Sequence, residues 1–287
     1  MGLSINQHPA AIMAGFNRQI LSSRDWTLTS EDPEGPHQLR VGLRRLRSGL
    51  WLFRPLLPPG YAKPLSLQAR WLGQETGHLR DLEVLLYETV QPYLKATGGD
   101  KTLAALDRHL TVAVRRQKQD LVKTLHSERV ARFLEEADPL NCTGFWIASA
   151  GQAAALRDLC RAALDLRHRQ AHDLGRHFRG LDEPDRHEFR KTLKKLRYTA
   201  ECANAVFAAP QTKAYIKQLK VLQEGLGAMN DAVVAREILT SITSDLAPDA
   251  PARIAAMALA DVRDSHVNLD KQRIQKLWKA LAKKDPL

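Results

Sequence analysis

The sequence carries two short basic motifs in which the same residue types recur at the same spacing. The first motif runs from His37 to Arg47 and the second from His187 to Arg197, at a constant offset of 150 residues. Each begins with His and places basic residues three, seven and ten positions later, which are His37, Arg40, Arg44 and Arg47, and then His187, Arg190, Lys194 and Arg197. Arg and Lys side chains at such density are suited to binding phosphate oxygens, since Arg forms bidentate contacts and Lys supplies a mobile point charge.

The spacing places each motif along one side of an α-helix. At about 100° per residue, the four residues of each set fall within a narrow stripe. Leucines border the stripe of the first motif, and Phe189, Leu193 and Leu196 border that of the second. We call these sets the first row (His37, Arg40, Arg44, Arg47) and the second row (His187, Arg190, Lys194, Arg197). Cations packed this closely repel one another, so a polyanion lying along the rows is the simplest explanation. The alternative is a solvated charged face.

The repeat continues beyond the two motifs without a gap. Leu72, Gly77, Asp81 and Val84 align with Leu222, Gly227, Asp231 and Val234, and Arg70 aligns with Lys220. A match in two separate blocks indicates a duplication. It divides the chain into residues 1–145 and 146–287, each expected to form a bundle of about four helices.

Hydrophobic residues recur at three- and four-residue steps almost throughout, which predicts an all-α fold. Prolines and the Gly98–Gly99 pair mark the breaks. The predicted helices cover 5–22, 36–54, 64–94 (with an end or kink at Pro92), 101–126, 128–137, 145–180, 184–208, 211–227, 229–243 and 250–283.

Composition limits the class of protein. The 287 residues include 43 Lys or Arg and 32 Asp or Glu, a formal net charge of +11, which favours a polyanionic partner. No apolar stretch is long enough to span a membrane, so no membrane partner is expected. Three widely spaced cysteines favour a reducing, cytoplasmic compartment over a disulfide framework.

Other chemistry-bearing residues have simpler explanations. His168 and His172 lie four apart, but nothing completes a metal-binding set; we expect no metal and no cofactor. Asp81 and Asp231 are expected near a helix start, as caps or as ion-pair partners of a neighbouring Arg, rather than as general bases. Trp51, Trp71 and Tyr198 are expected in the core or at its rim, and not as stacking platforms for bases.

The two repeat blocks resemble the CHAD family, the conserved histidine α-helical domain. The resemblance rests on both basic motifs together with Leu79–Leu82 and the segment from Leu226 to Asp231. It implies two four-helix subdomains related by a pseudo-two-fold axis, a basic groove or channel at their junction, and binding of inorganic polyphosphate, often on polyphosphate granules. No catalysis is established for this domain alone. The Glu-x-Glu-x-Lys motif of the enzyme joined to some family members is absent, so the chain looks like a stand-alone binding domain.

The sequence therefore predicts a non-enzymatic, polyphosphate-binding protein. The residues expected to bind polyphosphate are the two rows together with four residues of the following helices, Arg70, Arg80, Lys217 and Lys220. Leu67 aligns with Lys217, so the halves are expected to contribute unequally. Nucleic-acid binding through the same charges is the alternative, although aromatic residues make up only 6% of the chain. A phosphate-transferring enzyme would need a carboxylate cluster that the sequence lacks. Oligomeric state is left open.

Overall fold

The computed structural model describes residues 8–147, 153–207 and 209–284, with the side chains of 262–270 left aside. Within these ranges the protein is all-α and contains no strand, as predicted. The α-helices are α1 (Pro9–Thr29), α2 (Glu34–Leu52), α3 (Ala62–Leu85), α4 (Gln91–Ala96), α5 (Lys101–Leu125), α6 (Glu128–Ala137), α7 (Ala153–Gly175), α8 (Glu183–Phe207), α9 (Pro210–Asp245) and α10 (Pro251–Leu281). Short 3₁₀ segments connect several of them. None of these helices is both long and apolar enough to cross a bilayer.

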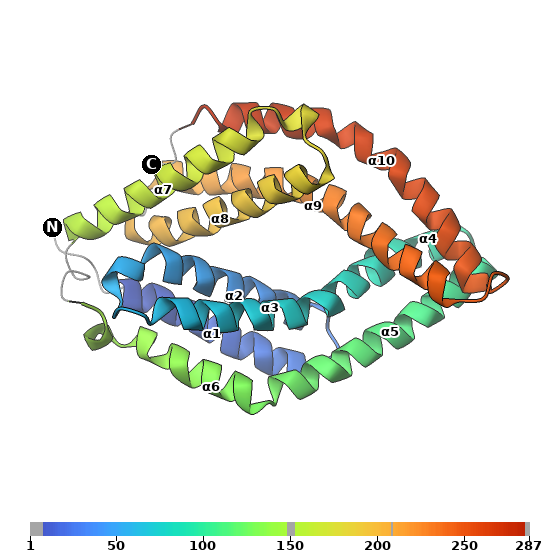
Figure 1. Cartoon of the computed structure of the whole chain (residues 1–287), viewed down its shortest axis with the longest axis horizontal. Coiled ribbons are helices and arrows are strands. Elements are labelled where there is room, and N and C mark those ends of the chain that lie inside the picture. The colour runs from blue at the N-terminus through green and yellow to red at the C-terminus, as the bar shows by residue number, and fades with distance from the viewer. Residues whose placement is uncertain (1–7, 148–152, 208, 285–287) are drawn as a thin grey trace.

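The helices form two groups that meet along the middle of the molecule (Figure 1). Helices α1, α2, α3, α5 and α6 lie on one side, and α7 to α10 lie on the other. Neighbours in sequence pack together within each group, and α2–α8, α3–α9 and α5–α10 contacts join the groups. The motif-bearing helices α2 and α8 are therefore in direct contact. The division into residues 1–145 and 146–287 stays a prediction.

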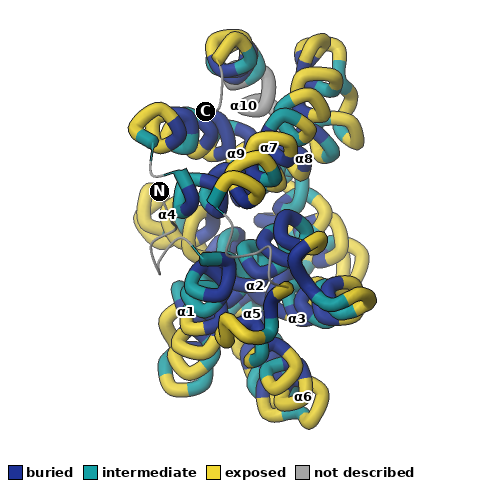
Figure 2. The backbone as a smooth tube through the Cα atoms, turned by 90° about the vertical axis from the view of Figure 1, so that its left-hand side faces the viewer, coloured by how far each residue is buried: buried dark blue, intermediate teal, exposed yellow. Residues whose placement is uncertain are grey.

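The predicted leucine stripes lie in the core. Leu39, Leu43, Leu46 and Leu50 of α2 are at most 1% exposed. Phe189, Leu193 and Leu196 of α8 are completely buried, and the buried apolar residues of both groups belong to one continuous cluster. Figure 2 shows this burial along the inner sides of the helices. Each fully buried Leu contributes about 2 kcal/mol to folding, so the stripes fix which side of α2 and of α8 stays accessible.

Several predicted boundaries were wrong. The spans 211–227 and 229–243 form the single helix α9, because the glycines at 225 and 227 weaken a helix but do not end it. Helix α1 continues seven residues past its predicted end at residue 22, to Thr29. The span 145–180 is shorter, since α7 covers Ala153–Gly175 and residues 148–152 lie outside the described part.

The third predicted helix is interrupted where Pro92 requires it. A π-helical turn, η3 (Leu86–Val90), separates α3 from α4. Pro92 lies in the first turn of α4, where its missing N–H is tolerated. The wider turn just before a proline relieves the clash of its ring with the preceding helix. The interruption predicted at Pro92 thus lies just before it, at residues 86–90, and the helix continues past the predicted end at residue 94, to Ala96.

Helix α7 ends in close contact with aromatic residues of the second group, and this contact can be tested. A Cβ at Gly175 would lie 2.7 Å from the Phe189 ring and closer still to Trp278. Rigid rings cannot move aside, so we expect Gly175→Ala to destabilise the protein by about 1–3 kcal/mol in urea unfolding followed by circular dichroism. Gly73→Ala in α3 is the matched control. A Cβ there meets nothing within 4 Å, so that variant should gain up to about 1 kcal/mol.

Candidate anion-binding site

Helices α2 and α8 hold the two basic rows beside their shared contact. In the first row all four side chains are half-buried. In the second row His187 is exposed, and the other three are half-buried. Because the leucine stripes pack inward, the rows lie at the border between the core and the surface. The helical placement predicted from the spacing is therefore confirmed.

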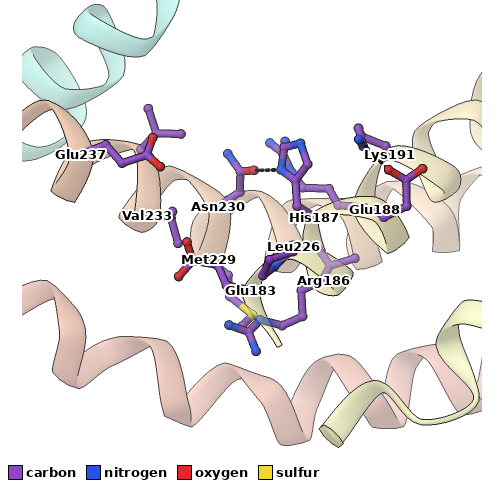
Figure 3. Close-up of a pocket in the computed structure, with 13 residues that line it drawn as sticks. Glu183, Arg186, His187, Glu188, Lys191, Leu226, Met229, Asn230, Val233 and Glu237 are labelled. Carbon is purple, nitrogen blue, oxygen red and sulfur yellow. Dashed lines mark hydrogen bonds and ion pairs between the residues drawn. The ribbon is translucent and has the colours of Figure 1, made fainter. Parts of the chain in front are cut away.

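The two histidines occupy matching positions but have different surroundings. His187 Nδ1 lies 2.9 Å from Asn230 Oδ1 (Figure 3). The amide oxygen can only accept, so this contact is a hydrogen bond when Nδ1 carries the hydrogen, and Nε2 has no described partner. At the position equivalent to Asn230, the first half has Arg80. Burial first, and then the charges of Arg80, Arg44 and Arg40, lower the pKa of His37.

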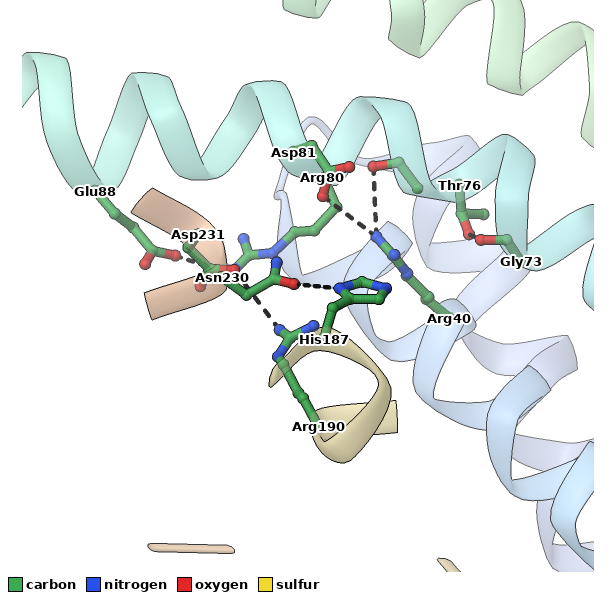
Figure 4. Close-up of polar contacts among 11 residues, drawn as sticks. Arg40, Gly73, Thr76, Arg80, Asp81, Glu88, His187, Arg190, Asn230 and Asp231 are labelled. Atoms are coloured by element: carbon green, nitrogen blue, oxygen red, sulfur yellow. Dashed lines mark hydrogen bonds and ion pairs between the residues drawn. The ribbon is translucent and has the colours of Figure 1, made fainter. Parts of the chain in front are cut away.

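One carboxylate pairs with the first Arg of each row. Arg40 Nη1 lies 3.6 Å from Asp81 Oδ1, and Arg190 Nη2 lies 3.7 Å from Asp231 Oδ1 (Figure 4). The same pair therefore forms at repeat-related positions. The expected helix start was wrong, since both aspartates lie inside α3 and α9. The alternative, an ion pair with a neighbouring Arg, is confirmed.

The remaining cations of the two rows act on each other across the α2–α8 contact. Burial, followed by the charges of Arg44, Arg190 and Arg40, lowers the pKa of Lys194 to about 6. Burial, followed by the charge of Arg44, lowers the pKa of Arg40 to about 10, with Asp81 opposing and Arg190 adding to the shift. Cations of α2 thus destabilise the charged forms of cations on α8. The two rows converge.

Several guanidinium groups in this region have N–H donors without a partner. The Nε atoms of Arg47, Arg190 and Arg197 are buried, and no hydrogen-bond acceptor reaches them. A buried donor without an acceptor costs about 1–3 kcal/mol. These unpartnered donors add to the cost of holding the cations close together.

The four outlying predicted residues differ in their relation to the rows. Arg70 is exposed on α3, and its charge, after burial, lowers the pKa of Arg47. Arg80 pairs with Glu88 at 2.8 Å, yet its charge still reaches His37. Lys217 and Lys220 are exposed on α9, without a described contact to either row. The structure therefore brings the charges of Arg70 and Arg80 within reach of the rows, whereas the part played by the two lysines stays a prediction.

Three residues near the rows were missed as contributors. Arg45 lies on another side of α2, and its Nε lies 3.0 Å from Glu201 of α8. Glu201 also pairs with Arg197 at 3.4 Å, so one carboxylate joins both halves and partly neutralises the second row. Arg167 of α7 has a buried Nε without an acceptor. Its charge, after burial and the opposing effect of Glu188, contributes to lowering the pKa of Lys195. No local sequence pattern links α7 to α2 and α8.

An arginine guanidinium group lies over the ring of each of the three aromatic residues singled out in the sequence, Trp51, Trp71 and Tyr198. Arg167 lies 3.7 Å above the ring of Trp51, and Arg129 lies 3.5 Å above that of Trp71. Both tryptophans are half-buried, and Tyr198 is buried. These positions agree with the prediction that they belong to the core or its rim.

One of the two histidines considered for metal binding, His168, lies within hydrogen-bonding distance of another side chain. His168 Nδ1 lies 2.8 Å from the Tyr215 hydroxyl. Across the described part of the chain, no group of three or more His, Cys, Asp or Glu side chains could hold a metal ion.

The crowding of Lys194 predicts a pH-dependent cost to folding. Its pKa is near 10.5 when unfolded and about 6 when folded, so the cost grows as the pH falls from 10.5 to 6 and is constant below. We expect Lys194→Met to raise the free energy of unfolding in anion-free buffer by about 1–2 kcal/mol near pH 7, and by less near pH 9.5. Lys213→Met, at an exposed position of α9, should change little at either pH. An equal gain at both pH values would contradict the crowding of Lys194.

Comparisons with known proteins agree with this architecture. The CHAD domain family matches residues 11–240. The CHAD domain of the plant Ricinus communis has a similar structure, with a TM-score of 0.79 and 24% identity over 99% of this chain and 94% of that chain. PptA from Streptomyces chartreusis is also similar, with a TM-score of 0.72 and 19% identity over 97% of this chain and 100% of that chain. At these identities the likeness concerns the fold.

A partial match connects the chain to a protein of different description. The tRNA uridine(34) hydroxylase of Enterococcus faecalis is 31% identical over 142 residues, which are 49% of this chain and 44% of that protein. The chain therefore matches less than half the length of this curated relative. The family match, in contrast, covers most of the sequence and includes both basic motifs. The chain belongs to the CHAD domain family.

Proposed function

We propose that this protein binds inorganic polyphosphate between its two basic rows and does not act on it chemically. The observation that carries the proposal is the convergence of the rows, in which Lys194 is held among Arg44, Arg190 and Arg40. Such an arrangement opposes folding unless negative charge enters it. A polyphosphate chain carries a regular series of negative charges, which would lie along the series of cations in each row.

Binding would use charge pairing with little shape recognition. Arg47, Arg190 and Arg197, whose Nε donors have no partner, would each donate hydrogen bonds to phosphate oxygens, which guanidinium forks bind bidentately. Neutralising several phosphates releases counterions, so affinity should fall steeply with salt concentration. Arg70, Arg80, Lys217 and Lys220 would extend the contacts for longer chains.

The donor set favours binding over phosphate transfer. The carboxylates nearest the rows, Asp81 and Asp231, pair with Arg40 and Arg190, so they compensate cations instead of gathering metal ions for catalysis. Phosphate release from polyphosphate in the presence of Mg²⁺ or Mn²⁺ would contradict this part of the proposal.

We also propose that the protein is located in the cytoplasm, on polyphosphate granules.

A double charge reversal at the centre of the rows tests the proposal. Arg44 and Lys194 form no ion pair with a described carboxylate, and both are half-buried. We expect Arg44→Glu/Lys194→Glu to reduce the affinity for long-chain polyphosphate at least a hundredfold in titration calorimetry, with helicity unchanged by circular dichroism. The reversal places two carboxylates where phosphate oxygens would lie.

The control lowers the net charge at least as much, at a distance from the rows. Arg108 and Arg116 are exposed on α5, so Arg108→Glu/Arg116→Glu should alter the affinity only slightly. Similar losses in the two double variants would show that net charge, and not the rows, determines binding. Unchanged affinity in the first variant would place the site elsewhere.

Nucleic-acid binding is the second candidate, and the partial match to a tRNA-modifying enzyme favours it. The rings of Trp51 and Trp71 are each covered on one face by an arginine, which leaves less surface for base stacking. We expect long-chain polyphosphate to displace RNA or single-stranded DNA at equal phosphate concentration. Failure to do so would favour the second candidate.

The state of Lys194 predicts that protons are taken up on binding. In the ligand-free protein the pKa of Lys194 is about 6, and a bound phosphate raises it. At a pH between the ligand-free and the ligand-bound pKa, the side chain therefore gains a proton on binding. Affinity should therefore fall as the pH rises above 6. Calorimetry near pH 7.5 in buffers of different ionisation enthalpy should detect uptake of up to about one proton per site. In Lys194→Met the uptake should be much smaller, and equal uptake in both proteins would contradict the assignment.

A further inference from the structure

A cavity of about 530 Å³ lies beside the second row, between the start of α8 and the middle of α9 (Figure 3). This volume lies within the range of small-molecule sites. His187 and Arg190 of the second row form part of its wall. The cavity is therefore continuous with the proposed polyphosphate site.

The wall of the cavity combines charged residues of α8 with residues of α9 that change from apolar to acidic toward Glu237. Leu226, Met229, Val233 and Val234 provide apolar surface next to His187 and Arg190. Glu183 and Glu237 belong to the wall as well, and Figure 3 shows Glu237 and His187 on opposite sides of Asn230 and Val233. Glu237 follows Asn230 by seven residues, about 10 Å along a helix.

Most of the other charged groups in the wall are already paired. Lys191 pairs with Glu188, and Glu183 pairs with Arg236 at 3.0 Å. Glu237 has no described ion pair and is exposed. Arg186 donates to the Leu181 carbonyl oxygen, and Arg190 pairs with Asp231 through Nη2 but has an Nε without an acceptor. The groups open to a ligand are therefore the His187–Arg190 end and the Glu237 carboxylate.

This apolar wall is only partly shared by the first half. At the repeat-related positions, Leu79 and Val84 match Met229 and Val234, but Thr76 and Glu83 replace Leu226 and Val233. A bare phosphate chain makes no use of apolar surface, so polyphosphate binding does not account for the difference.

We infer that the cavity binds the nucleoside end of a nucleoside polyphosphate whose base carries an amino group. This inference rests on the proposed function, because the phosphates would lie on His187 and Arg190 and continue toward Lys194. The base would pack on Met229 and Val233, and its amino group would donate to the Glu237 carboxylate. A ligand anionic at one end, apolar in the middle and hydrogen-bond-donating at the other end matches the sequence of groups in the wall.

Three ligands separate the contributions of base and phosphate. ATP, ITP and tripolyphosphate carry similar phosphate chains, and ITP has a carbonyl where ATP has an amino group. We expect ATP to bind at least tenfold more tightly than tripolyphosphate in calorimetry, because ATP, unlike tripolyphosphate, buries a base in the cavity. ITP should bind more weakly than ATP, since its carbonyl oxygen would face the Glu237 carboxylate.

Two variants test the cavity directly. Val233→Phe fills it and should remove the advantage of ATP over tripolyphosphate, with tripolyphosphate binding unchanged. Val221→Phe, at an exposed position of the same helix, is the matched control and should leave all affinities unchanged. Glu237→Gln, also at an exposed position, should remove the discrimination between ATP and ITP, and it serves as the independent test if Val233→Phe does not fold.

The outcomes separate this inference from the proposed function. If polyphosphate binds but ATP binds no more tightly than tripolyphosphate, the nucleotide inference is overturned and the proposed function stands. Equal losses of ATP and tripolyphosphate in Val233→Phe, or unchanged discrimination in Glu237→Gln, would overturn it too. If neither polyphosphate nor ATP binds, the proposed function itself fails.

Discussion

Repulsion between cations across the α2–α8 contact is the constraint on which the candidate site depends. Burial of the leucine stripes, at about 2 kcal/mol for each fully buried Leu, holds the two helices together. The cations at the border of that contact repel one another, and burial, followed by the charges of Arg44, Arg190 and Arg40, lowers the pKa of Lys194 to about 6. This region of positive potential therefore destabilises the fold locally, and a bound anion would offset the destabilisation.

The protein's own carboxylates reduce this charge without removing it. Asp81 and Asp231 each hold one guanidinium at the ends of the rows, and Glu201 links Arg45 of the first half to Arg197 of the second. These pairs fix the direction of the arginine side chains, which lowers the entropy that a ligand must remove on binding. At the centre, Arg44 has no described carboxylate partner, and Lys194 would regain its charge when an anion binds.

The two halves have diverged around a common frame. Both keep a His, an Arg–Asp ion pair and a cation row at repeat-related positions. The first half places a second cation, Arg80, beside its His, whereas the second places the neutral Asn230 there and opens an apolar cavity next to it. The repeat-related positions thus carry more positive charge in the first half, whereas in the second half they border the cavity for which we infer nucleotide binding.

The sequence alone determined the all-α fold, the stripes and the rows, because helical periodicity and an ungapped offset of 150 residues are local and strong signals. It did not determine that α9 is continuous, since weak helix formers such as the glycines at 225 and 227 stop a helix only where packing permits. Only the tertiary structure decided that the rows face each other, that Asp81 and Asp231 pair from inside their helices, and that Arg167 and Glu201 approach the rows. These contacts depend on how helices distant in sequence pack, and no periodicity within a single helix contains that information.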